Sequence, residues 1–163
     1  MKEEKILKTN VMRILDQKKI NYTIYTYPHD DEAVDGATVA ELIGRDPIMV
    51  YKTLVTKSTH KNNMYYVFVI PVLKSLDLKK AAKIVNEKGI EMIAVKDLLQ
   101  LTGYVRGGCS PIGMKKQFST VFSDDLNTLS SVIFSAGKIG LQVEISPLEL
   151  KKVFPYKIAD ITE

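Results

Sequence analysis

The chain has 163 residues, of which 45% are hydrophobic and 26% are charged. This balance fits one globular domain over residues 1–163, and no run approaches the roughly 18 apolar residues of a membrane helix. The acidic residues near the amino terminus do not suit a signal peptide, so we expect a cytoplasmic protein without a membrane partner. The formal net charge of +4 permits a nucleic-acid partner without indicating one.

Cysteine and histidine are scarce. The single cysteine, Cys109, excludes an internal disulfide, and two separated histidines offer no metal-ligand spacing. We therefore expect neither a metal site nor a cofactor.

The first elements are an amphipathic helix, a strand and a short helix. Apolar residues at i, i+4, i+7 and i+8 favour the first helix, and alternating β-branched and aromatic residues favour the strand. Thr38 and Glu41 resemble a capping box for the second helix, which Gly44 can end. The predicted ranges are 4–18, 21–27 and 38–43.

A lysine lies within the next strand. Asp46 can cap a helical turn at Pro47, after which strands 50–57 and 64–72 form a hairpin whose second member is central. Lys52 shares its face of the strand with apolar residues, so its ammonium must reach water or occupy a polar pocket. An edge-strand lysine that faces water is an equal alternative.

The following elements lead to a glycine-rich loop. Ser75 predicts the start and Gly89 the end of a helix, and strand 90–95 and helix 96–101 come after it. Beyond the loop we expect strand 118–122, a turn at 124–126, the hairpin of strands 131–136 and 141–145, and a helix that Ser146, Pro147 and Glu149 begin. Mixed helices and hairpins favour an α+β fold with a curved, partly barrel-like mixed sheet surrounded by helices.

The glycine-rich loop is TGYVRGGCSPIGMKK, residues 102–116. Its glycines can adopt backbone angles that a Cβ forbids, so successive N–H groups can converge on an oxygen or an anion. Taken alone, such a loop is more often an ordinary connection. Lys115 and Lys116 adjoin it, whereas the lysines at 79, 80, 83, 151 and 152 are typical of solvated helix faces.

Five segments together resemble the YbaK/EbsC family of aminoacyl-tRNA editing domains, which are related to the editing insertion of bacterial prolyl-tRNA synthetases. The lysine strand and the glycine loop are the most specific part of this resemblance, which is strongest to the stand-alone Cys-tRNA(Pro) deacylase branch. It implies a bent mixed sheet that opens a crevice on one side. The segments are YTYPHD at 25–30, VYKTLV at 50–55, LDLKKAAK at 76–83, GYVRGGCSPIGMKK at 103–116 and SAGKIGLQVEISP at 135–147.

The resemblance also implies the site residues. The family's essential lysine falls on Lys52, and its G-x-x-x-P loop begins at Gly107, so the amides of Gly107 and Gly108 are the natural oxyanion donors. Relatives often carry an acidic residue where this chain has Gln142, which can accept a hydrogen bond from a substrate amine but brings no charge. The implied substrate-binding residues are Tyr27, Thr53, Cys109, Ser110, Pro111, Ser135 and Gln142.

The implied activity is hydrolysis of mischarged Cys-tRNA(Pro), with the substrate thiol attacking its own ester. The implied partners are the acceptor end of an aminoacyl-tRNA and prolyl-tRNA synthetase in a ternary complex, and no DNA. Three alternatives stay open: a deacylase of another small amino acid, such as Ala-tRNA(Pro); a hydrolase with Cys109 as nucleophile and His29 as base; and a non-catalytic module that binds tRNA ends or nucleotides.

Overall fold

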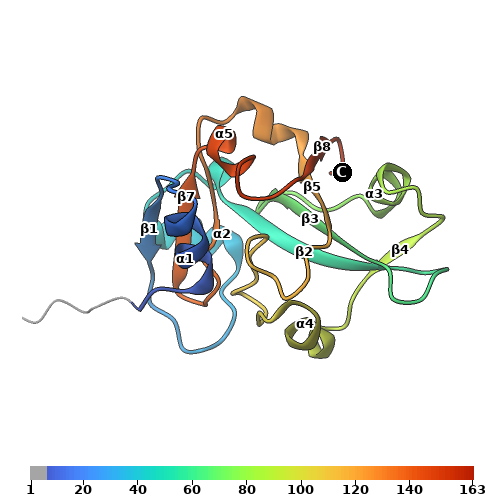
Figure 1. Ribbon diagram of the computed structural model, residues 1–163, viewed down its shortest axis with the longest axis horizontal. Coiled ribbons are helices and arrows are strands. Elements are labelled where there is room, and N and C mark those ends of the chain that lie inside the picture. The colour runs from blue at the N-terminus through green and yellow to red at the C-terminus, as the bar shows by residue number, and fades with distance from the viewer. Residues whose placement is uncertain (1–6) are drawn as a thin grey trace, which may run out of the picture.

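The computed structural model describes residues 7–163, so residues 4–6 of the first predicted helix lie outside the described part. The expected α+β class is confirmed (Figure 1). None of the helices in residues 7–163 combines the length and apolar character needed to span a membrane. The helices are α1 (Asn10–Gln17), α2 (Gly36–Ile43), α3 (Leu78–Ile84), α4 (Val95–Thr102) and α5 (Pro147–Leu150), with 3₁₀ turns at Pro47–Met49 and Asp124–Thr128. The strands are β1 (Thr23–Thr26), β2 (Tyr51–Ser58), β3 (Tyr65–Pro71), β4 (Ile90–Met92), β5 (Ser119–Ser123), β6 (Val132–Ser135), β7 (Leu141–Ile145) and β8 (Lys157–Ala159).

The mixed sheet is divided into two hydrogen-bonded sheets. Five strands lie in the order β4-β2-β3-β5-β8 and three in the order β1-β7-β6. The β2–β3 hairpin is antiparallel, whereas β5 runs parallel to both β3 and β8, so β3 is central as predicted. A parallel bridge between Val50 and Ile133 connects the two sheets. The sheets therefore curve around a shared interior without closing into a barrel.

Burial on both faces explains why β3 is almost wholly apolar. Val67 and Val69 face the main core, which α1 and the smaller sheet complete. Phe68 and Ile70 face the opposite side, where α3 covers the sheet. A strand covered on both faces has no solvent side that needs polar residues.

The structure corrects the predicted start of α2. Asp35, and not Thr38, caps this helix, because the Asp35 carboxylate accepts hydrogen bonds from the Thr38 amide at 3.0 Å and from the Thr38 hydroxyl at 2.6 Å. The predicted end is confirmed, since Gly44 adopts φ 71°.

The predicted limits of α3 are also wrong. Asp77 caps it by accepting from the amides of Lys79 and Lys80, both at 3.0 Å, while the backbone of Ser75 accepts from Glu163 in the carboxyl-terminal segment. The helix ends at Ile84 with Val85 as its C-cap, before Gly89, because Asn86 takes a positive φ of 59°.

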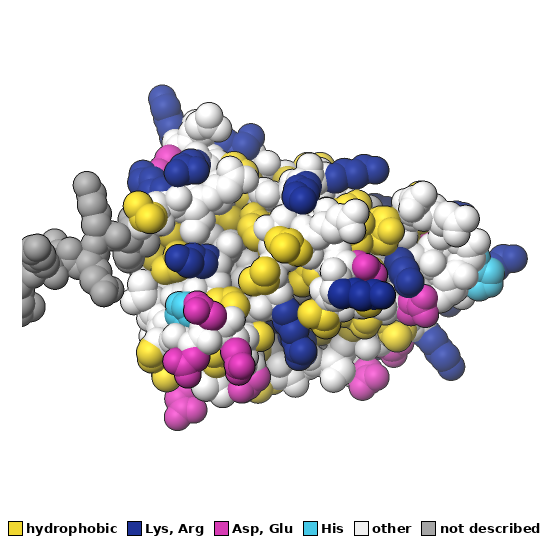
Figure 2. Space-filling view, turned by 90° about the horizontal axis from the view of Figure 1, so that it is seen from below, with side chains coloured by type: hydrophobic (Ala, Val, Ile, Leu, Met, Phe, Trp, Pro, Cys, Tyr) yellow, Lys and Arg dark blue, Asp and Glu magenta, His cyan; other side chains and the backbone are white. Residues whose placement is uncertain are grey.

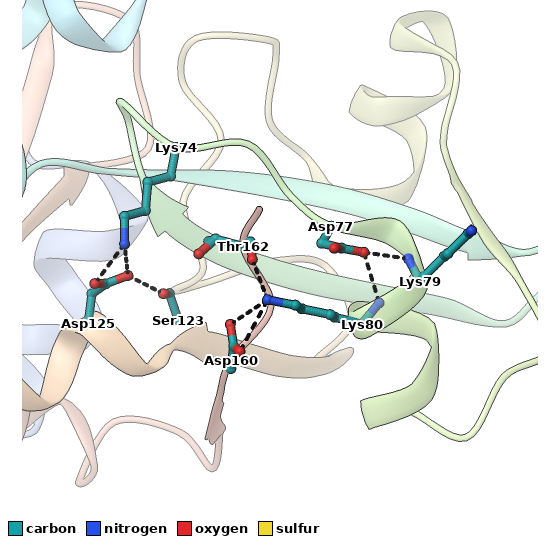
Figure 3. A network of polar contacts seen from close by, with 8 residues as sticks. All are labelled: Lys74, Asp77, Lys79, Lys80, Ser123, Asp125, Asp160 and Thr162. Atoms are coloured by element: carbon teal, nitrogen blue, oxygen red, sulfur yellow. Dashed lines mark hydrogen bonds and ion pairs between the residues drawn. The ribbon is translucent and has the colours of Figure 1, made fainter.

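The carboxyl-terminal segment joins the larger sheet through β8, a strand that local pattern did not predict. Leu76 forms a bridge with Thr162, and the Lys80 ammonium contacts Asp160 at 3.2 Å and the Thr162 carbonyl at 2.9 Å (Figure 3). Ile161 is fully buried beside α3. The segment is thus part of the packed fold.

Candidate active site

An open pocket lies where β2 and α2 meet the glycine loop and the β6–β7 hairpin. Its free space is about 110 Å³, which suits a small side chain better than a large one. Seven of the ten predicted site residues line it, and apolar residues from α2 and its surroundings complete the wall. The lining residues are Tyr27, Val34, Gly36, Val39, Val50, Tyr51, Lys52, Thr53, Val72, Gly107, Cys109, Ser135 and Gln142.

Lys52 brings a positive charge to this pocket. It lies opposite Ile70 of β3 on a half-buried stretch of β2, so it is not a solvated edge lysine. Burial lowers the pKa of its ammonium, because a charge loses hydration there. Within residues 7–163 no carboxylate forms an ion pair with it. A partly desolvated, unpaired cation is available to an anion or a developing negative charge.

Three of the polar lining residues come from the smaller sheet and its turns. Ser135 and Gln142 are cross-strand partners on β6 and β7. The Ser135 hydroxyl accepts a hydrogen bond from the Gly137 amide at 3.1 Å, which fixes its position and leaves its own proton free to donate. Tyr27 is anchored by its amide, which donates to the Gly140 carbonyl at 3.0 Å.

Thr53 carries an unsatisfied group. Its Oγ1 is buried and has no hydrogen-bond partner among the described residues, although Thr53 lines the pocket. A buried hydroxyl without a partner costs about 1–3 kcal/mol, so a bound polar group that pairs with it gains affinity.

The glycine loop contributes Gly107 directly. This residue has φ 86°, and a Cβ would lie 2.9 Å from the Cα of Ala33, so only glycine fits here. No hydrogen bond within residues 7–163 involves the amide of Gly107 or that of Cys109. Both residues line the pocket, so their N–H groups are the donors open to a substrate oxygen.

The amide of Gly108, which the resemblance implies as a second oxyanion donor, has a partner within the protein. This amide already donates to the Val105 carbonyl at 3.0 Å, which closes a tight turn. Gly108 packs against Lys138 and Ile139 and does not line the pocket. The Cys109 amide, which the sequence did not single out, has no hydrogen-bond partner within residues 7–163.

Ser110 and Pro111 lie behind the pocket and not in it. Ser110 is fully buried, and its hydroxyl accepts from the Ile112 amide at 3.3 Å. Tyr104 donates a hydrogen bond to the Ile112 carbonyl. These contacts hold the shape of the loop, and neither Ser110 nor Pro111 is among the residues that line the pocket.

The Cys109 thiol does not have the surroundings of a nucleophile. Burial raises its pKa to about 12, and a hydrogen bond with Thr102 offsets this only in part. His29 does not line the pocket, and its Nδ1 accepts from the Asp31 amide at 3.2 Å. A reactive cysteine needs a stabilised thiolate, which this site does not provide.

Sequence patterns did not predict the valine side chains that form the apolar side of the pocket. Val34, Val39 and Val72 come from three separate segments, and Gly36 is required beside them because a Cβ there would meet the Val72 side chain at 2.3 Å. In residues 7–163 no three His, Cys, Asp or Glu side chains are grouped as metal ligands.

Comparison with known proteins assigns the chain to a family. The profile of the aminoacyl-tRNA editing domain matches residues 30–153, which include every pocket residue except Tyr27. The chain belongs to the aminoacyl-tRNA editing domain family. It is accordingly an enzyme of the aminoacyl-tRNA deacylase class.

One relative of this editing domain is a protein of Enterococcus faecalis (strain ATCC 700802 / V583), named provisionally as the Cys-tRNA(Pro)/Cys-tRNA(Cys) deacylase EbsC. It is 42% identical over 155 residues, which cover 95% of this chain and 93% of the relative. Two solved structures share the fold. Hypothetical protein APE2540 matches with a TM-score of 0.82 and 22% identity over 94% of this chain and 99% of the other. A protein described provisionally as a trans-editing enzyme for prolyl-tRNA synthetase matches with a TM-score of 0.79 and 21% identity over 95% and 98%.

Proposed function

We propose that this editing domain is a trans-acting deacylase that hydrolyses the ester of Cys-tRNA(Pro). It would act in the cytoplasm as one domain, on an acceptor end delivered in complex with prolyl-tRNA synthetase. The 42% identical relative, whose name contains this activity, supports the substrate. The pocket chemistry supports the mechanism.

The observation that carries the mechanism is the kind of residue that lines the pocket. The lining residues include Lys52 but no histidine, aspartate or glutamate. The only thiol, that of Cys109, has a pKa raised to about 12 by burial. Ester hydrolysis without an enzyme base requires another nucleophile, and a cysteinyl substrate carries one.

The reaction proceeds in two steps. The substrate sulfur attacks the ester carbonyl carbon, the bond from that carbon to the ribose oxygen breaks, and the proton that the thiol loses goes to the ribose oxygen. Water then opens the cyclic thioester and releases free cysteine.

The protein contributes position and polarity. The amides of Gly107 and Cys109 donate to the developing oxyanion, for which one such donor is worth on the order of 10²–10³ in rate. Lys52 adds a positive charge, and the Thr53 hydroxyl, which has no protein partner among the described residues, pairs with a substrate oxygen. These are positioning and electrostatic roles.

Proximity favours a thiol over a hydroxyl. Well-oriented intramolecular reactions reach effective molarities of about 10⁵–10⁸ M. Ring strain in a small thiolactone offsets part of this gain. A thiol of pKa about 8.5 is already a few per cent thiolate near pH 7, whereas a serine hydroxyl is not ionised. Cys-tRNA should therefore be hydrolysed faster than Ser-tRNA, although the two amino acids are nearly isosteric.

The test is a deacylation panel with Cys-, Ser-, Ala- and Pro-tRNA, together with Cys-tRNA whose sulfur is methylated. Each rate is corrected for spontaneous hydrolysis. We expect Cys-tRNA to be cleaved at least about tenfold faster than Ser- or Ala-tRNA, and the methylated substrate to be inert. Equal rates for Ala-tRNA and Cys-tRNA would exclude substrate-thiol attack and assign the chain to alanine editing by an activated water. Binding of every tRNA without turnover would indicate a non-catalytic module.

A further inference from the structure

Charge is distributed unevenly between two segments that each contribute lining residues to the pocket, the glycine loop through Gly107 and Cys109 and the loop between β1 and α2 through Val34. The segment from α4 through the glycine loop carries four exposed cations, which we call the basic margin: Lys96, Arg106, Lys115 and Lys116. The loop between β1 and α2 carries exposed acids and no lysine or arginine, and Asp30, Asp31 and Glu32 are here called the acidic margin. The two loops that carry these margins meet where Ala33 packs against Gly107.

The cations of the basic margin are not used in ion pairs. Within residues 7–163, no carboxylate lies within salt-bridge distance of any of the four. The Lys115 side chain lies along Gly103 at the end of α4, and the Lys116 ammonium lies 5.9 Å from the ring centre of Phe118. These positive charges are therefore free to meet phosphates.

Exposed apolar side chains lie among these cations. Val95 and Leu99, one turn apart on α4, are 61% and 54% exposed, and Val105 of the glycine loop is 47% exposed. Figure 2 views this face from below, where α4 lies in Figure 1, and shows hydrophobic side chains interspersed with Lys and Arg; one group of acidic side chains lies at the lower left, and others lie among the cations on the right. An apolar surface interspersed with cations suits the sugars, bases and phosphates of a single-stranded nucleic acid.

We propose that the single-stranded 3′ end of the tRNA reaches the pocket across α4 and the basic margin, and that the acidic margin excludes the phosphate backbone from the other side. This inference rests on the proposed function for the identity of the substrate, but it concerns the path of the RNA and not the amino acid.

Two observations favour RNA over a protein as the occupant of this surface. The unpaired cations complement a phosphate backbone, and the surface continues through Arg106 into the residues that line the pocket, Gly107 and Cys109. A strand of RNA that ends in the pocket must cross one of its margins, and only one of the two margins described here is positively charged.

The test measures binding of uncharged tRNA and of an RNA hairpin with a single-stranded 3′ end, at several salt concentrations. Removal of two charges in the Lys115→Gln/Lys116→Gln variant should weaken binding at low salt. The slope of log affinity against log salt should fall by about 0.7 for each lysine that contacts a single-stranded phosphate. An unchanged slope would overturn the proposal.

The matched control removes the same charge elsewhere. Lys79→Gln/Lys83→Gln changes two exposed lysines of α3, which lies away from α4 (Figure 1). This variant should bind with the affinity and salt slope of the unaltered protein. An equal loss of affinity would show that net charge alone governs binding, and would contradict a defined path.

Two further variants test the direction of the path and the apolar surface. Asp30→Asn/Glu32→Gln should bind RNA as tightly as the unaltered protein or more tightly, and weaker binding would contradict exclusion by the acidic margin. Leu99→Gln should weaken binding without changing the salt slope, because it removes a nonionic contact. If Leu99→Gln left RNA binding unchanged but abolished association with prolyl-tRNA synthetase, this face of α4 would belong to a protein partner and the proposal would fail.

These measurements separate the inference from the proposed function. If Cys-tRNA were not hydrolysed but RNA binding depended on Lys115 and Lys116, the path would stand and the substrate would be wrong. If hydrolysis were normal and RNA binding insensitive to both lysines, the substrate would stand and the path would be wrong.

Discussion

A lysine on a half-buried stretch of a strand is costly unless its charge has a use. The pKa of Lys52 is lowered by burial, so the folded protein holds the ammonium less favourably than the unfolded chain does. No ion pair within residues 7–163 offsets this cost. The charge of Lys52 therefore does not stabilise the fold, and its place in the pocket points to the substrate.

Lys52→Met should therefore separate stability from activity. We expect the melting temperature to hold or rise, since an apolar side chain of similar length replaces a desolvated charge, while kcat/KM falls by at least about a hundredfold. Thermal denaturation and deacylation kinetics measure the two effects. Lys57→Met, on the same strand but outside the pocket, is the control and should retain turnover. Loss of folding in Lys52→Met, or a rate within a few-fold of normal, would remove Lys52 from the proposed site.

The Cys109 thiol should react slowly with alkylating agents. Its pKa, raised to about 12 by burial, leaves little thiolate near neutrality, so iodoacetamide should modify it about a hundredfold or more slowly in the folded protein than in urea. Cys109→Ser should keep most of the deacylase activity, because the attacking sulfur belongs to the substrate. Mass spectrometry follows the modification. Complete loss of turnover in Cys109→Ser, with the fold retained, would make Cys109 the nucleophile.

At the scale of elements, a polar network holds the smaller sheet together on the face of β7 that also carries Gln142. The Glu144 carboxylate of β7 accepts hydrogen bonds from Tyr25 of β1 and from Ser131, both at 2.6 Å, and pairs with Arg45 at 2.7 Å. Desolvation alone would raise the pKa of Glu144, but the bonds from Ser131 and Tyr25 and the charge of Arg45 hold it below its ordinary value. The network positions β7, which carries Gln142.

Glu144→Gln should lower the unfolding free energy at pH 7 by about 1–3 kcal/mol, because hydrogen bonds to a charged acceptor are lost. The folded-state pKa is depressed, so this stabilisation is present above the unfolded pKa and is lost as pH falls through the folded value. The difference in unfolding free energy between the variant and the unaltered protein should therefore be smallest at acidic pH. Urea denaturation between pH 3 and pH 7 measures this, and a constant difference across the range would contradict the role of the charge.

At the scale of the whole molecule, the last ten residues stabilise the fold although they lie beyond the matched family segment. β8 pairs with β5, Ile161 is fully buried, and the Lys80 contacts shown in Figure 3 tie this segment to α3. The larger sheet is thus completed by the carboxyl terminus.

Ile161→Ala should lower the unfolding free energy by about 2–5 kcal/mol, through lost burial and the cavity that remains. Because Ile161 packs in the cluster beside α3 and not at the pocket, kcat of the folded fraction should be unchanged. Denaturation and active-site-normalised kinetics measure the two quantities. A fall in kcat at full folding would link this cluster to the site.

Local sequence patterns were sufficient for most elements and for part of the site. Three features depend only on neighbours within a few residues: the face of β2 on which Lys52 lies, the β2–β3 hairpin, and the end of α2 at Gly44. Composition alone left the glycine loop as an ordinary connection, and only the family resemblance pointed to Gly107, whose φ of 86° requires a glycine.

Other features required the tertiary structure, because they depend on residues far apart in the chain. Contacts between distant segments form the strand β8 and bring Val34, Val39 and Val72 together at the pocket. Competition among nearby capping groups decides where α2 and α3 begin. Composition likewise did not decide which loop amides remain without a partner. The Gly108 amide donates to Val105, whereas those of the pocket-lining Gly107 and Cys109 have no partner within residues 7–163. Sequence patterns specify which conformations a segment can adopt, and packing decides which polar groups are left for a substrate.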